Sequence, residues 1–147
     1  MKYTIPPPQL VAVGAVLGGL GVACGAFGAH GIEGFAAERY SDPDLLARRL
    51  ENWRTGADYH LWHALAVVAC GLFGMSAPHR GGRRLDSTAV RWAGLALGAG
   101  VFVFSGSLYL LTLTGKTWLG AVTPIGGALF IIGWALLAFA AFRVKKG

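Results

Sequence analysis

The sequence predicts an all-α integral membrane protein, a four-helix bundle with a short interfacial helical segment before its second span. Hydrophobic residues make up 54% of the 147 residues. Charged residues make up only 14%, whereas a soluble domain has about 25%. Four stretches are also mostly apolar over the ~20 residues that a helix needs to cross a bilayer. We therefore expect one transmembrane domain over residues 1–147, with spans at about 10–29, 57–77, 90–114 and 118–142.

Five glycines mark the first span: Gly14, Gly18, Gly21, Gly25 and Gly28. At 100° per residue they fall in one narrow stripe of a helix. Each such glycine costs a soluble helix roughly 1 kcal/mol, but in a bilayer it lets another helix approach closely. We interpret the stripe as a packing seam, in which leucine at Gly21 or Gly25 would find no room. An apolar run after Met1-Lys2 also resembles a signal peptide, but its full spanning length predicts a retained helix.

The polar segment between the first and second spans contains a predicted helix start at Ser41-Asp42-Pro43. Asp42 is the expected N-cap, and Pro43 fits the first turn. Apolar residues then recur at helical spacing at Leu46, Leu50, Trp53 and Ala57. This pattern predicts an amphipathic helix at the membrane interface or an extension of the second span. We favour the extension because the periodicity continues without a proline.

The third span carries two opposite seams of small or polar residues. One face holds Gly94, Gly98, Val101, Ser105, Tyr109 and Thr112. Gly100, Ser107 and Thr114 face nearly the other way. A helix with two such seams is expected to contact neighbours on both sides. We therefore expect a homo-oligomer or a membrane-protein partner within the lipid bilayer.

Basic residues predict the orientation of the chain. In a four-span protein the N-terminus, the second loop and the tail share one side, which carries eight Lys and Arg residues against five on the other. Because cytoplasmic loops are enriched in Lys and Arg, both termini are expected to be cytoplasmic. The net charge of +6 is explained by these loops, so it does not indicate binding to nucleic acid.

Polar residues gather in the non-cytoplasmic half of the predicted bundle. The candidate ligand site or polar cluster consists of His30, Tyr59, His60, His63, Ser105 and Tyr109. Ionisable residues inside a membrane are costly, so such a cluster deserves a functional hypothesis.

The three histidines of this cluster allow three interpretations: a metal or haem site, hydrogen bonding across helices, and a proton or ligand relay. His30, His60 and His63 could ligate a metal or haem, but the chain has no Cys pair, Met cluster or in-phase carboxylate to complete the set. Hydrogen bonding across helices is the commoner role of such residues. We therefore expect no cofactor, and any metal would fall to these three histidines.

Four motifs resemble one known family. They are GAFGAHG at 25–31, TGADYHLWHAL at 55–65, FSGSLYLLTLTG at 104–115 and TPIGGALFIIGW at 123–134. Together they are similar to the YwdK-like and YgdD-like small inner-membrane proteins, a domain of unknown function with a mitochondrial membrane relative in animals. The resemblance implies a four-span protein of the bacterial inner membrane and no established activity, substrate or cofactor.

The most consistent hypothesis is a non-enzymatic membrane protein that acts as a scaffold or accessory subunit. No nucleophile–base pair, carboxylate pair or complete ligand set is found in the sequence. One alternative is binding of haem, metal or quinone through the histidines. Another is a small transporter or lipid-handling protein, although no titratable carboxylate lies within the spans, and Pro124 indicates a local kink rather than a broken helix.

Overall fold

The computed structural model describes residues 6–75, 83–84, 87–143 and 145–146. These parts are almost entirely helical. The α-helices are α1 (Pro7–His30), α2 (Ile32–Ala37), α3 (Pro43–Met75), α4 (Ser87–Gly100), α5 (Gly106–Thr114) and α6 (Leu119–Phe142). A π-helix, η1 (Val101–Ser105), joins α4 to α5, and two-residue strands β1 (Arg83–Arg84) and β2 (Lys145–Lys146) pair antiparallel. Most of the predicted second loop, residues 78–86, lies outside the described residues.

Three helical segments in the described part are long and apolar enough to cross a membrane: Pro7–His30, Thr88–Thr114 and Leu119–Phe142. They correspond to the predicted first, third and fourth spans. The predicted second span falls in α3, whose Asp58, His60 and His63 make it less apolar. That fourth crossing therefore stays a prediction.

Helix α3 runs without a break from Pro43 to Met75, so the favoured extension of the second helix is confirmed. Its start is capped as predicted, because Asp42 Oδ1 accepts a hydrogen bond from the backbone N–H of Asp44 at 3.0 Å. At 1.5 Å per residue α3 is about 50 Å long, well above the ~30 Å of a hydrocarbon core. The short helix α2, which precedes it, was not predicted.

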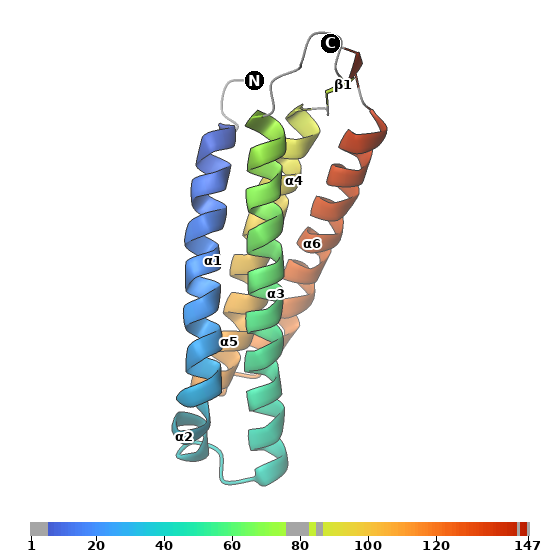
Figure 1. Ribbon diagram of the computed structural model, residues 1–147. Coiled ribbons are helices and arrows are strands. Elements are labelled where there is room, and N and C mark those ends of the chain that lie inside the picture. The colour runs from blue at the N-terminus through green and yellow to red at the C-terminus, as the bar shows by residue number, and fades with distance from the viewer. Residues whose placement is uncertain (1–5, 76–82, 85–86, 144, 147) are drawn as a thin grey trace.

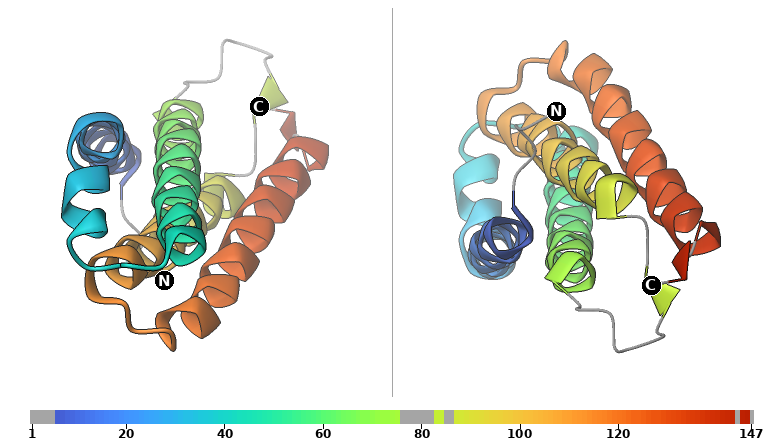
Figure 2. Two further views of the ribbon diagram at one scale, coloured as in Figure 1. Left: turned by 90° about the horizontal axis from the view of Figure 1, so that it is seen from below. Right: turned by 90° about the horizontal axis from the view of Figure 1, so that it is seen from above.

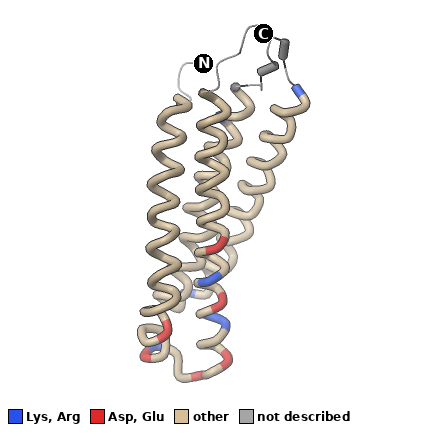
Figure 3. The backbone as a smooth tube through the Cα atoms, viewed as in Figure 1, with Lys and Arg blue, Asp and Glu red and all other residues tan. Residues whose placement is uncertain are grey.

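The long helices lie side by side, with the described ends of the chain at one end of the molecule and α2 at the other (Figure 1). Helix α1 packs mainly on α3, whereas α6 packs on α4 and η1. Seen end-on, α1 and α6 lie on opposite sides, with α3 and the α4–η1–α5 segment between them (Figure 2). Among the residues that Figure 3 colours by charge, the charged ones gather at the α2 end, around α2 and the first half of α3.

The glycine stripe of α1 divides into two sets. Gly14, Gly21 and Gly28 face α3, and a Cβ atom on them would lie 2.7 Å from Val68 N, 3.3 Å from the His60 ring and 2.8 Å from the Trp53 ring. These three residues of the stripe thus lie in close contact with α3.

Gly18 and Gly25 do not share this role, because a Cβ atom placed on either would meet no heavy atom of another described helix within 4 Å. The prediction that Gly25 has no room for a side chain is therefore wrong within the subunit. The reason is angular: each lies four residues after a packed glycine, which turns it by about 40° away from α3.

Close packing also holds the third helical segment. A Cβ atom on Gly94 would lie 3.2 Å from Cys70 Cβ, and one on Gly98 would make only an ordinary contact, 3.9 Å from Val67. The closest approach was not predicted from sequence: a Cβ atom on Gly126 of α6 would overlap the backbone of Phe104 in η1.

Candidate functional site

His63 is held in one protonation state by hydrogen bonds on both sides of its ring. It is buried on α3, and its Nδ1 lies 2.8 Å from the Tyr59 carbonyl oxygen. Trp134 Nε1–H of α6 donates to Nε2 at 3.2 Å. An indole N–H only donates, so Nε2 must be unprotonated and Nδ1 carries the proton. The neutral ring also stacks on Phe130, with ring centroids 3.5 Å apart. Because both nitrogens of His63 have hydrogen-bond partners, neither is free to bind a metal.

His60 lies three residues before His63 on α3. One of its ring nitrogens has a hydrogen-bond partner, and the other has none among the described residues. Its Nδ1 lies 3.3 Å from the Tyr109 hydroxyl oxygen of α5. Its Nε2 is buried against α1, near the Leu17 backbone, without a hydrogen bond of normal geometry. Gly21 of α1 packs against the same edge of the His60 ring. His60 Nε2 is therefore buried between α1 and α3.

Aromatic rings extend the cluster in both directions along α3. Tyr59 stacks on Phe104 of η1, with ring centroids 4.7 Å apart. Trp53 donates from Nε1 to the Cys24 carbonyl oxygen of α1 at 2.9 Å, and its ring centroid lies 4.6 Å from that of Tyr109. The aromatic and polar side chains of α3 thus connect α1, η1, α5 and α6.

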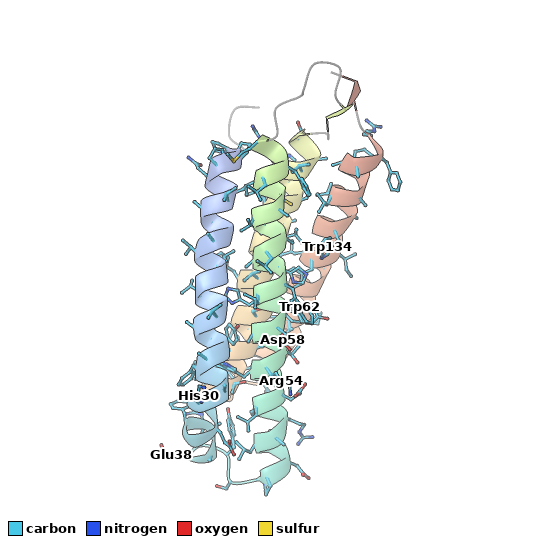
Figure 4. The ribbon with its side chains drawn as sticks, viewed as in Figure 1. His30, Glu38, Arg54, Asp58, Trp62 and Trp134 are labelled. Atoms are coloured by element: carbon cyan, nitrogen blue, oxygen red, sulfur yellow. The ribbon has the colours of Figure 1, made fainter. Side chains whose placement is uncertain are left out.

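The other two members of the predicted polar cluster stand apart in role or place. Ser105 is completely buried at the end of η1, and its hydroxyl has no hydrogen-bond partner among the described residues. His30 is exposed at the α2 end of α1, away from Trp134 (Figure 4). It lies nine residues beyond Gly21, which is about 13 Å along the helix axis. His30 is therefore not brought together with His60 and His63.

No group of three or more His, Cys, Asp or Glu side chains in the described ranges is placed to hold a metal ion. Tyr59, His60, His63 and Tyr109 do lie close together, but both His63 nitrogens, His60 Nδ1 and the Tyr109 hydroxyl contact one another, backbone or Trp134. The arrangement can lock helices in register. Cys24 and Cys70 are both free thiols.

A second polar connection joins the start of α3 to the end of α5. Thr112 Oγ1 donates to the Arg49 carbonyl oxygen at 2.9 Å, and the Tyr40 hydroxyl donates to the Thr112 carbonyl oxygen at 2.8 Å. Arg39 donates to the Thr114 carbonyl oxygen at 2.8 Å. The Tyr40 and Arg39 donors satisfy carbonyls that the last turn of α5 leaves unpaired. Gly115 follows with φ of +72°, a left-handed helix end that favours glycine.

Two important residues were missed from the sequence, Trp134 and Trp53. Trp134 was counted as an apolar position of the fourth span, and Trp53 as an apolar position of the helix predicted before the second span. The available signal was the indole N–H, which needs an acceptor when it is buried away from water. By contrast, the predicted polar seam at Ser107 is confirmed, since its hydroxyl lies 2.8 Å from Thr123 Oγ1 of α6.

Comparison with known proteins gives the family of the chain. Residues 24–127 match a family described as "Protein of unknown function (DUF423)". The chain is 38% identical over 133 residues to the UPF0382 membrane protein YwdK of Bacillus subtilis, with 90% of this chain and 95% of the relative covered. It is also 38% identical over 133 residues to the UPF0382 membrane protein SAB0533 of Staphylococcus aureus, with 90% and 94% covered.

No solved structure matches the chain significantly. The sequence match covers nearly the whole chain, and its relatives are named membrane proteins, which agrees with the three apolar helical segments. The resemblance to the YwdK-like proteins is thereby confirmed. The chain belongs to the DUF423 family, whose members are membrane proteins of unknown function.

Proposed function

We propose that the protein is a non-enzymatic, four-span subunit of the bacterial inner membrane that acts as a scaffold or accessory component. The observation that carries the proposal is that the buried polar groups of the protein form hydrogen bonds within and between its helices. The His63 ring is fixed by Tyr59 and Trp134, and Trp53 is fixed by the Cys24 carbonyl. Such bonds hold helices together, and the names of the relatives contain no enzymatic activity.

The fourth crossing of this proposal is the second half of α3. It lies between α1 and the α4–η1–α5 segment over most of their length, as expected if all four cross together. The described ends of the chain lie at one end of the molecule. An even number of crossings, together with the positive-inside rule, supports a cytoplasmic location of both termini.

A homo-oligomer or a complex with another membrane protein is part of the same proposal. Gly18 and Gly25 of α1 face open space, and large apolar side chains such as Val16 and Ile131 are 64% and 72% exposed. Lipid can cover such surfaces. Open glycines on a spanning helix nevertheless favour close approach by another helix.

Reporter fusions test the number of spans. With four spans, a reporter after Ser41 is non-cytoplasmic and a C-terminal reporter is cytoplasmic. If α3 did not cross, the reporter after Ser41 would keep its place but the C-terminal reporter would become non-cytoplasmic. That second result overturns the four-span proposal.

Purification tests the accessory role. We expect a colourless, metal-free protein that elutes as copies of itself, or with another membrane protein, at fixed stoichiometry. A monodisperse monomer with stoichiometric haem or metal would overturn the proposal and make the histidines a ligand site. The absorbance spectrum, elemental analysis and native mass in detergent are measured on the same sample.

A further inference from the structure

A groove of about 590 Å³ lies where the end of α1, α2 and the first half of α3 meet. Its volume falls in the roughly 300–1,000 Å³ range of small-molecule sites. Small residues line its apolar part, among them Gly25 and Gly28 of α1 and Ala57 of α3. Because the apolar segment of α1 ends at His30, the groove lies at the level where acyl chains meet lipid headgroups.

Charged residues line the other part of the groove. Glu33 of α2 and Glu51 and Asp58 of α3 contribute carboxylates, and Arg54 of α3 contributes a guanidinium. Arg54 lies three residues after Glu51 and four before Asp58, so these side chains share one face of α3. All four side chains are exposed. The groove therefore offers several anionic groups beside one cationic group, with an apolar surface next to them.

We infer that this groove binds one phospholipid whose headgroup carries a primary ammonium beside its phosphate. The ammonium lies among the carboxylates of Glu51 and Asp58, and the phosphate lies against Arg54. An acyl chain follows the surface of small residues at Gly25 and Gly28. This inference rests on the membrane placement given under the proposed function.

Charge complementarity selects this class of lipid. An anionic headgroup would bring further negative charge toward the three carboxylates, which is unfavourable. A choline headgroup has no N–H to donate, whereas a primary ammonium donates three hydrogen bonds to carboxylates. The single guanidinium of Arg54 matches one phosphate. The choline and the primary-ammonium headgroup each carry one phosphate, so this contact does not distinguish between them.

Retention of lipid by the full-length protein tests the inference. The protein is reconstituted in nanodiscs of equal parts phosphatidylethanolamine, phosphatidylcholine and phosphatidylglycerol, and bound lipids are identified by native mass spectrometry. We expect one retained phosphatidylethanolamine, favoured over phosphatidylglycerol about tenfold, as two partly exposed ion pairs allow. Retention of the three lipids in their bulk proportions overturns the inference.

Charge variants locate the site. The double variant E51Q/D58N is expected to lower the preference for phosphatidylethanolamine to less than twofold. The matched variant E38Q/D44N also removes two carboxylates at the same end of the molecule, but outside the groove lining, and is expected to keep the preference. An equal loss in both variants would show a general effect of charge and would refute the site.

A glycine variant tests the apolar part without changing charge. Gly25→Leu projects into open space, so the helices stay packed while the groove is filled, and we expect at least tenfold less retained lipid. Gly19→Leu, which is also unobstructed and outside the groove lining, is the control. Normal retention in Gly25→Leu contradicts the inference. The reporter fusions are independent of these readouts, so a failure here leaves the four-span proposal standing.

Discussion

Adjacent glycines of α6 offer a matched test of how closely the helices pack. A Cβ atom on Gly126 would overlap the backbone of Phe104 in η1, whereas one on Gly127 would lie 4.0 Å from the Phe104 ring. The two alanine variants therefore differ in steric contact and hardly at all in helix position. Alanine gains about 1 kcal/mol over glycine in a helix interior, and this gain applies to both variants.

The energetic cost of the overlap decides whether Gly126→Ala stabilises or destabilises the protein. Overpacking in a well-packed core typically costs about 1–3 kcal/mol, and the upper end applies because backbone cannot rotate away as a side chain can. We expect Gly126→Ala to lower the free energy of unfolding by about 2 kcal/mol after the gain in helix propensity. This corresponds to a factor of about 30 in the unfolding equilibrium. Gly127→Ala should be neutral or up to about 1 kcal/mol more stable.

Reversible unfolding in mixed micelles, followed by circular dichroism as the denaturing detergent increases, measures both variants against the parent protein. The helix signal before unfolding serves as the control for folding. If Gly126→Ala were as stable as Gly127→Ala, the close contact between α6 and η1 would be wrong, and with it the packing that places Phe104 against Tyr59.

Two further predictions concern the contacts of α3. Trp134→Phe removes the donor to His63 Nε2. It should cost about 0.6 kcal/mol and no more than about 1.7 kcal/mol, the average and the maximum measured for side-chain hydrogen bonds between membrane helices. The same micelle titration measures the change, and a variant as stable as the parent would contradict the bond. Gly21→Leu should prevent folding, because the new side chain meets His60, whereas Gly25→Leu should fold. Size-exclusion profiles in detergent compare the two variants. Equal profiles would refute the division of the glycine stripe into packed and open positions.

The sequence predicted the helices well because their signal is local. Length and apolar composition alone place the spans at 10–29, 90–114 and 118–142 close to their observed bounds. The cap at Asp42 and the break at Gly115 also depend only on neighbouring residues. The second helix was more difficult, because its polar residues belong partly to helix packing and partly to the surface.

The candidate site was less predictable because its contacts join distant parts of the chain. His60 and His63 were identified as buried polar residues, but the partner of His63 is 71 residues away, on α6. The glycine stripe identified the face of α1 that has few side chains, but it did not show which part of that face contacts α3. Gly18 and Gly25 were therefore grouped with the packed glycines.

The π-helix was not predicted from the sequence and allows a final test. A π-turn inserts the equivalent of one extra residue into an α-helix, so the constant 100° phase used for the third span fails between Val101 and Ser105. The backbone N–H of Gly106 donates to the Val101 carbonyl oxygen five residues earlier. Deleting Phe102, which is 68% exposed, should convert this turn to α-helix and leave the α5 side chains in place.

Deleting Leu110 provides the matched control. It is also exposed, at 50%, but it lies in regular α-helix, so its removal turns everything after it by about 100°. Thr112 would then lose its bond to the Arg49 carbonyl. We expect near-normal expression and unfolding stability for the Phe102 deletion and no folded protein for the Leu110 deletion. If neither deletion variant folded, the extra residue in η1 would be required by the fold. The first residue to examine would then be Ser105, whose buried hydroxyl has no hydrogen-bond partner among the described residues.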